Sequence, residues 1–269
     1  MNNSNNNEKI LILDFGSQVT QLIARRVRES GVYSEIFPYT KWEEGLKKIK
    51  PKGIILSGGP ASTIDGSSPQ VSLEILNSGV PVLGICYGQQ TLCSQLGGKV
   101  EHSTKREFGR ANIKIIGKSD FFRDFEYNKE NEPVWMSHGD KVTELPEGFS
   151  VIAESENAPF AAIANEDKRI YGVQFHPEVI HTPNGSKMLE NFTHHICGCS
   201  GEWTIESFKE IAIERIKKQV GDGTVVCGLS GGVDSSVAAV LLHEAIGKQL
   251  TCIYVDTGLM RENETKEVV

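Results

Sequence analysis

A cysteine at the junction of a strand-like and a helix-like segment is the residue best suited to chemistry in this chain. Cys86 lies in the run VLGICYGQQ, residues 82–90, where aliphatic residues end at a Gly-x-Cys-x-Gly turn. The flanking glycines permit the sharp turn that presents a nucleophile at the end of a strand. A helix that begins at the thiol favours the reactive thiolate. A single cysteine in an apolar run is often an inert buried residue, so Cys86 needs partners.

A histidine and a glutamate two residues apart could supply the base that a thiol nucleophile requires. His176 follows the strand-like residues 169–175, and Glu178 comes two positions later. Because Pro177 favours an extended backbone before it, both side chains should lie on one side. Glu178 could then hold one ring nitrogen of His176 while the other faces Cys86. Alone, His-Pro-Glu is more often a turn at the end of a strand, but with Cys86 it predicts a catalytic triad.

Acyl transfer also needs N–H donors for a developing oxyanion. We expect one donor to be the backbone N–H of Tyr87, which directly follows the nucleophile. Residues 57–60, with the sequence SGGP, follow another predicted strand and contain Gly58 and Gly59. We expect Gly59 to turn the second N–H toward the site. The alternative is a tight turn that needs glycine only for its backbone conformation.

A glycine-rich segment near the C-terminus forms a second candidate site, for ATP. It lies between the predicted strand 225–229 and a predicted helix, and its members are Ser230, Gly231, Gly232, Val233, Asp234, Ser235 and Ser236. Backbone N–H groups and hydroxyls at a helix start can hold phosphates. The segment lacks the lysine of a Walker A loop, and Asp234 would repel phosphate unless a divalent cation bridged the two. We therefore expect ATP to bind with Mg²⁺ and Asp234 to contact the Mg²⁺; the alternative is a simple helix cap.

The elements expected around Cys86 alternate between strands and helices. Aliphatic runs predict strands at residues 9–14, 34–39, 53–57 and 80–85, and helical patterns cover 18–30, 41–49, 71–77 and 89–96. Such continuous aliphatic strands between helices are typical of a parallel sheet covered on both faces, so we predict an α/β fold. Shorter alternating segments at 111–116, 151–154 and 161–164 predict antiparallel additions to this sheet.

The pattern along the chain predicts three regions. Residues 1–8 are polar and of low complexity, and we expect a disordered tail. Residues 9–199 form the first domain, which a helix at 187–196 closes. Residues 200–269 begin a second α/β domain with a helix at 203–219, and this domain is incomplete.

Bulk composition narrows the classes of function. The chain has 269 residues and a net charge of −7, which argues against a broad nucleic-acid surface. It contains no apolar run long enough for a membrane span. The chain has six scattered cysteines, which predict reduced thiols in a cytoplasmic protein. Cys197 and Cys199 lack a second group of ligands at metal-binding spacing, so we interpret their segment as the end of a helix and not as a metal site.

Three motifs in this order resemble the class I, or triad, glutamine amidotransferases. The resemblance covers residues 9–197 and rests on residues 57–60, 84–90 and 176–178. It implies that Cys86 attacks the side-chain amide of glutamine, that His176 shuttles the proton and that Glu178 orients His176. It also implies that four residues help to hold the glutamine: Gly58, Gln90, Ser137 and His138.

The loop at 230–236 resembles that of the ATP pyrophosphatases, which adenylylate an oxygen and release pyrophosphate. A triad glutaminase followed by this loop resembles the glutamine-hydrolysing GMP synthase family, as do residues 14–29 and 135–140. The resemblance implies glutamine, XMP and ATP as substrates and a homodimer at full length. We expect the present segment alone not to make GMP. Three alternatives remain: another glutamine-dependent ligase of this ATP family, a glutamine-binding regulatory module with an inert triad, and a plain cysteine hydrolase.

Overall fold

The computed structural model divides the chain into two compact units, Met1–Trp203 and Thr204–Val269. The structure describes residues 8–66, 68–128, 130–256, 258, 263, 265 and 266, without the side chains of 104–106 and 207. The predicted tail at 1–7 lies outside the described residues. Glu8, which we assigned to the tail, accepts hydrogen bonds from the backbone N–H and the hydroxyl of Ser200, both at 2.7 Å. Our boundary at 199/200 precedes the division between the units by four residues.

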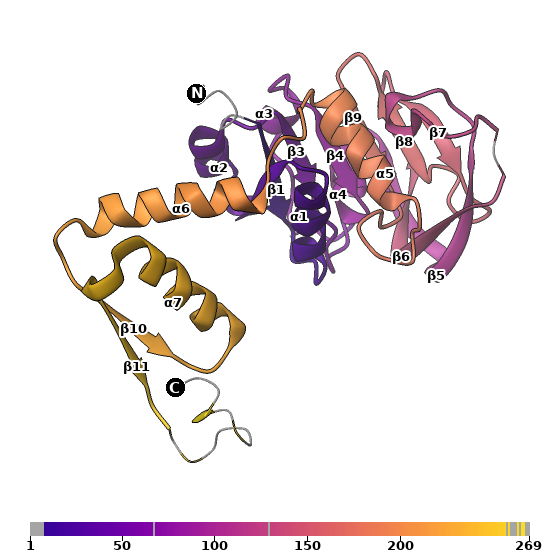
Figure 1. Ribbon diagram of the computed structural model, residues 1–269. Coiled ribbons are helices and arrows are strands. Elements are labelled where there is room, and N and C mark those ends of the chain that lie inside the picture. The colour runs from indigo at the N-terminus through magenta and orange to yellow at the C-terminus, as the bar shows by residue number, and fades with distance from the viewer. Residues whose placement is uncertain are drawn as a thin grey trace. The chain divides into compact units, whose positions relative to one another are not determined.

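A nine-stranded sheet forms the centre of the first unit (Figure 1), in the order β2-β1-β3-β4-β9-β8-β7-β5-β6. Five neighbouring strands are parallel: β2 (Tyr33–Pro38), β1 (Lys9–Asp14), β3 (Gly53–Leu56), β4 (Val82–Ile85) and β9 (Ile170–Val173). The predicted α/β class and parallel sheet are therefore confirmed.

Helices cover both faces of the parallel strands. In β1, Ile10 and Ile12 pack on the face covered by α1 (Thr20–Glu29) and α5 (Gly185–Glu190). Leu11 and Leu13 pack on the opposite face, which is covered by α2 (Trp42–Ile49), α3 (Leu73–Leu76) and α4 (Tyr87–Gln95). Because alternate residues of a strand point to opposite faces, a strand buried on both sides reads as one aliphatic run.

Short turns complete the first unit. They are the 3₁₀ turns η2 (Tyr39–Lys41) and η3 (Asp120–Phe122) and the π-helix η4 (Asn191–Ile196), which continues α5 and ends the predicted helix at 187–196.

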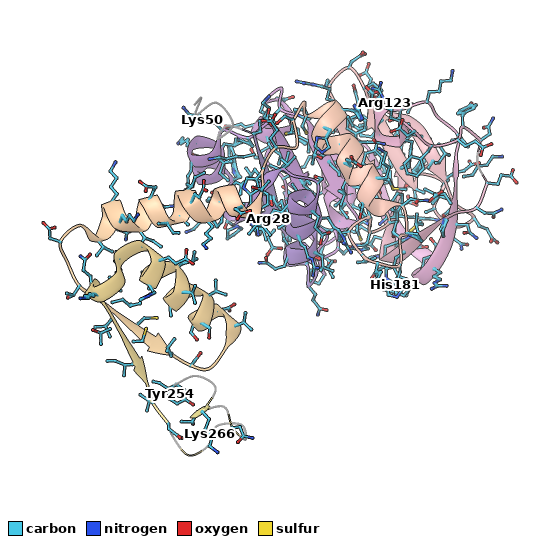
Figure 2. The ribbon with its side chains drawn as sticks, in the orientation of Figure 1. Arg28, Lys50, Arg123, His181, Tyr254 and Lys266 are labelled. Atoms are coloured by element: carbon cyan, nitrogen blue, oxygen red, sulfur yellow. The ribbon has the colours of Figure 1, made fainter. Side chains whose placement is uncertain are left out.

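A side chain ties the end of α1 to the start of β2. Arg28, labelled in Figure 2, donates a hydrogen bond of 2.7 Å to the carbonyl of Ser34.

The antiparallel part of the sheet is larger than the sequence suggested. It consists of β5 (Lys99–Ile115), β6 (Glu132–Glu144), β7 (Ser150–Glu154) and β8 (Ala162–Asn165). The alternating segments at 151–154 and 161–164 correspond to β7 and β8, and the segment at 111–116 corresponds to the end of β5. No segment indicated the rest of β5 or any of β6. The buried face of β6 includes His138 and Asp140, so polar residues interrupt the hydrophobic alternation that would reveal the strand.

The second unit begins an α/β arrangement. It contains α6 (Ile205–Val220), β10 (Val225–Leu229), α7 (Val233–Ile246), the 3₁₀ turn η5 (Gly247–Gln249) and β11 (Leu250–Tyr254). β10 and β11 pair in parallel, with Val225 opposite Leu250. Every helix in the described parts of the chain is too short or too polar to cross a membrane.

Candidate active site

Cys86 occupies a strained turn between β4 and α4. Its φ is 53° and its ψ is −106°, a conformation that costs a non-glycine residue about 1–3 kcal/mol. The Cys86 N–H donates to the carbonyl of Val173 at 2.7 Å, and the Cys86 carbonyl accepts from the N–H of Gln90 at 3.2 Å. A Cβ at Gly84 would lie 2.6 Å from the backbone of Gly88. The glycines on both sides of Cys86 thus allow the strand and the helix to meet, as expected.

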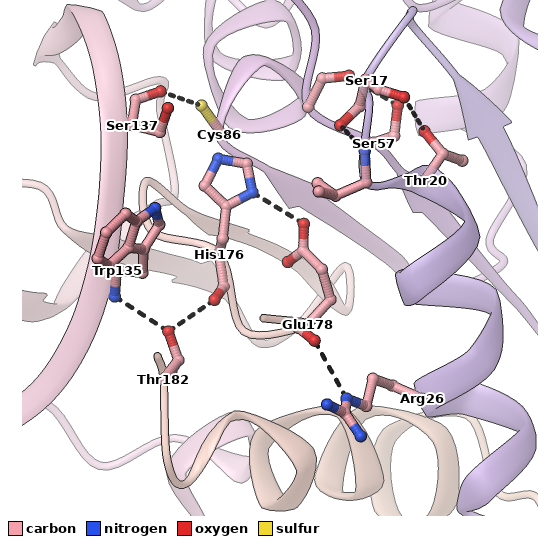
Figure 3. A network of polar contacts seen from close by, with 12 residues as sticks. Ser17, Thr20, Arg26, Ser57, Cys86, Trp135, Ser137, His176, Glu178 and Thr182 are labelled. Atoms are coloured by element: carbon pink, nitrogen blue, oxygen red, sulfur yellow. Dashed lines mark hydrogen bonds and ion pairs between the residues drawn. The ribbon is translucent and has the colours of Figure 1, made fainter. Parts of the chain in front are cut away.

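His176 and Glu178 form a close pair next to Cys86. His176 Nδ1 and Glu178 Oε1 lie 2.8 Å apart, and Figure 3 shows the His176 ring between Cys86 and Glu178. Burial by itself lowers the pKa of His176, but hydrogen bonding to Cys86 and to Glu178 outweighs burial and raises the pKa to about 10. The Glu178 side chain is fully buried, and among the described residues its Oε2 has no hydrogen-bond partner. The structure therefore brings the three predicted triad residues together.

Strand β6 and helix α1 hold the segment that carries this pair (Figure 3). The N–H of His176 donates to the carbonyl of Trp135 at 2.9 Å. Thr182 Oγ1 accepts from the Trp135 N–H at 3.0 Å and donates to the carbonyl of His176 at 2.7 Å. Arg26 Nε donates to the carbonyl of Glu178 at 3.1 Å. Three of these four bonds engage backbone atoms of His176 or Glu178, so they fix the pair from its main chain.

Two cavities meet at Cys86. The larger, of 430 Å³, is lined by Gly59, Tyr87, Gln90, Ser137 and His138, among others. The smaller, of 300 Å³, is lined by His176, Trp135 and residues 16–19. Cys86 is only 5% exposed, so its access to small molecules is through these two cavities.

The two predicted oxyanion donors, Gly59 and Tyr87, lie with Cys86 in the wall of the larger cavity. The hydrogen bond from Gln90 N–H to the carbonyl of Cys86 opens α4, so the N–H of Tyr87 has no intrahelical acceptor. Gly59 approaches the backbone so closely that a Cβ there would lie 2.7 Å from the carbonyl oxygen of Phe15. Their role as donors remains a prediction.

The four predicted glutamine contacts occupy different positions around the site. Gly58 lies against His176 and Cys86: a Cβ there would be 3.2 Å from His176 Cε1 and 3.7 Å from Cys86 Cβ. Ser137 directs its carbonyl oxygen to Cys86 Sγ at 3.5 Å. Gln90 donates its side-chain amide to the carbonyl of Asp140 at 2.9 Å.

His138 is held within the wall of the larger cavity. Its Nδ1 contacts the carbonyl of Asp140 at 3.0 Å and its Nε2 contacts Glu107 at 3.1 Å. Burial lowers the pKa of His138, and Glu107 only partly opposes this effect. His138 lies on the central part of β6, and its contact with Glu107 ties β6 to β5.

Comparison with known proteins identifies the first unit. The model of the family described as glutamine amidotransferase class-I matches residues 11–196, which is most of the chain. The chain belongs to the class-I glutamine amidotransferases. The solved structure of a protein described as a GMP synthase subunit, from Thermoplasma acidophilum, matches with a TM-score of 0.60 and 31% identity, over 76% of this chain and 96% of that chain. A glutamine amidotransferase structure from Thermotoga maritima matches at 18% identity with a TM-score of 0.58, over 71% of this chain and 99% of that chain, and supports the fold alone.

Full-length relatives of this amidotransferase match both units. The GMP synthase [glutamine-hydrolyzing] of Phenylobacterium zucineum is 60% identical over 269 residues, which is 100% of this chain and 52% of that protein. The proteins of the same name from Rhizobium etli and Zymomonas mobilis are 58% and 59% identical, each over 97% of this chain and 50% of their own length. The chain thus spans about half the length of the curated relatives it matches. A family model described as NAD synthase matches residues 205–267.

The second unit of this amidotransferase carries the predicted phosphate loop. Gly231 has a φ of 77°, and the first backbone bond of α7 runs from Ser236 N–H to the carbonyl of Gly232 at 3.2 Å. Ser230 Oγ and Ser235 Oγ lie 3.1 Å apart and brace the loop. The backbone N–H groups that open α7 therefore lack intrahelical acceptors, which is a feature of helix starts that bind anions. In the described residues, no group of three or more His, Cys, Asp or Glu side chains could hold a metal ion.

Three residues around the site, Gln174, Trp135 and Thr182, were not predicted from sequence motifs to act there. Gln174 follows β9 directly, and the pairing of Ile85 with Val173 places it beside Cys86. Once β4 and β9 are known to be neighbours, this register would have identified Gln174. Trp135 acts through its backbone N–H and carbonyl, and the Thr182 hydroxyl binds backbone groups of Trp135 and His176. Motifs of side chains do not reveal such contacts with the backbone of distant residues.

Proposed function

We propose that this chain is the glutamine-hydrolysing half, and the start of the ATP-binding half, of a GMP synthase. The observation that carries the proposal is the Cys86–His176–Glu178 cluster in a chain 60% identical, over its whole length, to the GMP synthase of Phenylobacterium zucineum. In this proposal residues 9–199 are the glutaminase domain and residues 200–269 belong to an ATP pyrophosphatase domain.

The proposed glutaminase reaction follows from the geometry. Cys86 Sγ forms a bond to the amide carbon of the glutamine side chain, and the N–H groups of Tyr87 and Gly59 stabilise the oxyanion. At neutral pH the raised pKa keeps His176 protonated, which is the form that can protonate the departing nitrogen. The C–N bond then breaks, ammonia departs, and a glutamyl thioester with Cys86 remains. His176 then accepts a proton from water, which attacks the thioester and releases glutamate.

The larger cavity is the proposed glutamine site. Gln90, Ser137 and His138 line it, and Gly58 lies beside the catalytic pair. Glu178 acts by holding Nδ1 of His176, which directs the other ring nitrogen toward Cys86.

The complete enzyme would use ATP to adenylylate the 2-oxygen of XMP, and ammonia would then displace AMP to give GMP. Residues 230–236 are the proposed contacts for the ATP phosphates, because the N–H groups at the start of α7 and the loop hydroxyls suit an anion. Asp234, in the first turn of α7, is the proposed Mg²⁺ contact. Bound Mg²⁺ would neutralise charge on the phosphates. A homodimer and a cytoplasmic location complete the proposal; six free cysteines are compatible with the latter.

Two substitutions in the full-length protein test this proposal. Cys86→Ala should abolish glutamate release while GMP formation from added ammonia continues, and glutamate release at the wild-type rate would contradict the triad. An unmodified protein that binds glutamine without releasing glutamate would instead be a regulatory module. Asp234→Ala should weaken XMP-dependent pyrophosphate release, and an unchanged dependence on Mg²⁺ and ATP would contradict the role of the loop.

A further inference from the structure

A chain of buried amide groups ends on the sulfur of Cys86. The side-chain nitrogen of Gln90 donates to the carbonyl of Asp140 at 2.9 Å and to Gln174 Oε1 at 3.2 Å. Gln174 Nε2 in turn lies 3.7 Å from Cys86 Sγ. Gln90 and Gln174 are 3% and 2% exposed, so water does not compete for these bonds.

The direction of this chain is set by a backbone atom. The carbonyl oxygen of Asp140 can only accept, so Gln90 must turn its NH₂ group toward it. That group lies between two acceptors, and its second proton goes to the oxygen of Gln174. Gln174 must then present its own NH₂ group on the opposite side, toward Cys86. A reversed Gln174 would set its NH₂ against the NH₂ of Gln90 and its oxygen against the sulfur.

We propose that Gln174 is a positioning residue whose side-chain N–H stabilises the negatively charged sulfur of Cys86. The proposal rests on the proposed function, in which this sulfur is the nucleophile. A donor hydrogen-bonded to a charged acceptor stabilises the charged form over the neutral form. The Ser137 carbonyl, at 3.5 Å on the same sulfur, has the opposite effect because it accepts the S–H proton. Two donors counter this preference: the ring of His176, which is hydrogen-bonded to Cys86, and the side-chain amide of Gln174.

The chain also connects the sulfur to the wall of the larger cavity. Gln90 lines that cavity, and both of its N–H protons are engaged by Asp140 and Gln174. Its carbonyl oxygen is therefore the group left for a ligand in the cavity. A ligand that donates to this oxygen would fix the orientation of Gln90 and, through it, the donor that faces Cys86.

The test measures the reactivity of Cys86 in the full chain with iodoacetamide, as a function of pH. Labelling is quantified at Cys86 by peptide mass spectrometry, and the exposed Cys252 serves as an internal reference. Gln174→Met keeps the side-chain length and removes the donor. We expect the midpoint of the Cys86 profile to move upward by about one pH unit, and the rate below that midpoint to fall roughly tenfold.

Two further variants separate this effect from a general loss of packing. Gln89→Met is the matched control, because Gln89 is equally buried and donates to the carbonyl of Phe160 at 2.9 Å without contacting the sulfur. Its Cys86 profile should coincide with that of the wild type. Gln174→Asn retains a buried amide but shortens it by one methylene, so it should reproduce the shift of Gln174→Met even where the latter folds poorly.

Two results would overturn the proposal: an unshifted profile in both Gln174 variants, or an equal shift in Gln89→Met. Glutamate release is measured in parallel on the wild-type full-length protein, as in the test of the proposed function. A shifted profile in a protein that releases no glutamate would refute the proposed function and leave the assignment of Gln174 intact. Normal glutamate release with an unshifted profile would refute the assignment of Gln174 and leave the proposed function intact.

Discussion

Replacing Thr182 by valine should loosen the segment that carries His176. The Thr182 hydroxyl is the common partner of the Trp135 N–H, at 3.0 Å, and the His176 carbonyl, at 2.7 Å. Thr182 is only 3% exposed, so water cannot readily take the place of the hydroxyl. Valine has nearly the same shape and leaves both backbone groups without this partner. A buried unpaired polar group costs about 1–3 kcal/mol, so the two together should lower the free energy of unfolding by about 2–6 kcal/mol.

Thr182→Ser is the matched control for this prediction. Serine keeps the hydroxyl and loses one methyl group, which costs about 1 kcal/mol. We expect Thr182→Val to be less stable than Thr182→Ser in denaturant unfolding and to have a lower kcat for glutamate release. Hydrogen exchange should show faster exchange of the Trp135 amide in the valine variant only. Equal stability of the two variants, with an unchanged Trp135 amide, would refute the reasoning.

Three other predictions concern the pair formed by His176 and Glu178 and the turn at Cys86. Glu178→Gln removes a charge-assisted hydrogen bond to His176, and glutamate release should fall by roughly 10- to 100-fold; a loss of less than about threefold would contradict the role of Glu178. The pKa of His176 rises from 6.5 to about 10 on folding, so the stability of the wild type relative to His176→Asn should be greatest below pH 6.5 and decline toward pH 10 in denaturant titrations. If the stability advantage of the wild type over His176→Asn increased with pH instead, the predicted direction of the pKa change would be wrong. Gly84→Ala should lower the unfolding free energy by about 1–3 kcal/mol because its Cβ would lie 2.6 Å from the backbone of Gly88, whereas Gly66→Ala, with open space around it, should change it by less than about 0.5 kcal/mol.

The sequence was most informative where chemistry and backbone geometry coincide. The Gly-x-Cys-x-Gly turn located Cys86 between β4 and α4, and the two-residue spacing placed Glu178 against His176. The aliphatic runs of β1, β3 and β4 identified the parallel sheet, because strands buried on both faces need apolar residues at every position.

The parts that escaped prediction depend on contacts between distant segments. Strand β6 was missed because its inward positions carry His138 and Asp140, which break the apolar alternation. Both residues line the larger cavity, so the strand faces a polar cavity at the positions where apolar residues would have revealed it. Gln174 was missed because its place beside Cys86 depends on the pairing of β4 with β9, which are far apart in the sequence.

The position of β6 at the end of the strand order has a consequence for association between molecules. An edge strand with free backbone groups can pair with a strand of another chain and start aggregation. At Trp135, the N–H is taken by Thr182 and the carbonyl by His176, so the segment that carries His176 shields this part of the edge. Changes that release the segment would therefore expose a template for intermolecular strand pairing. The hydrogen bonds that place His176 are thus also the ones that cover this part of the edge.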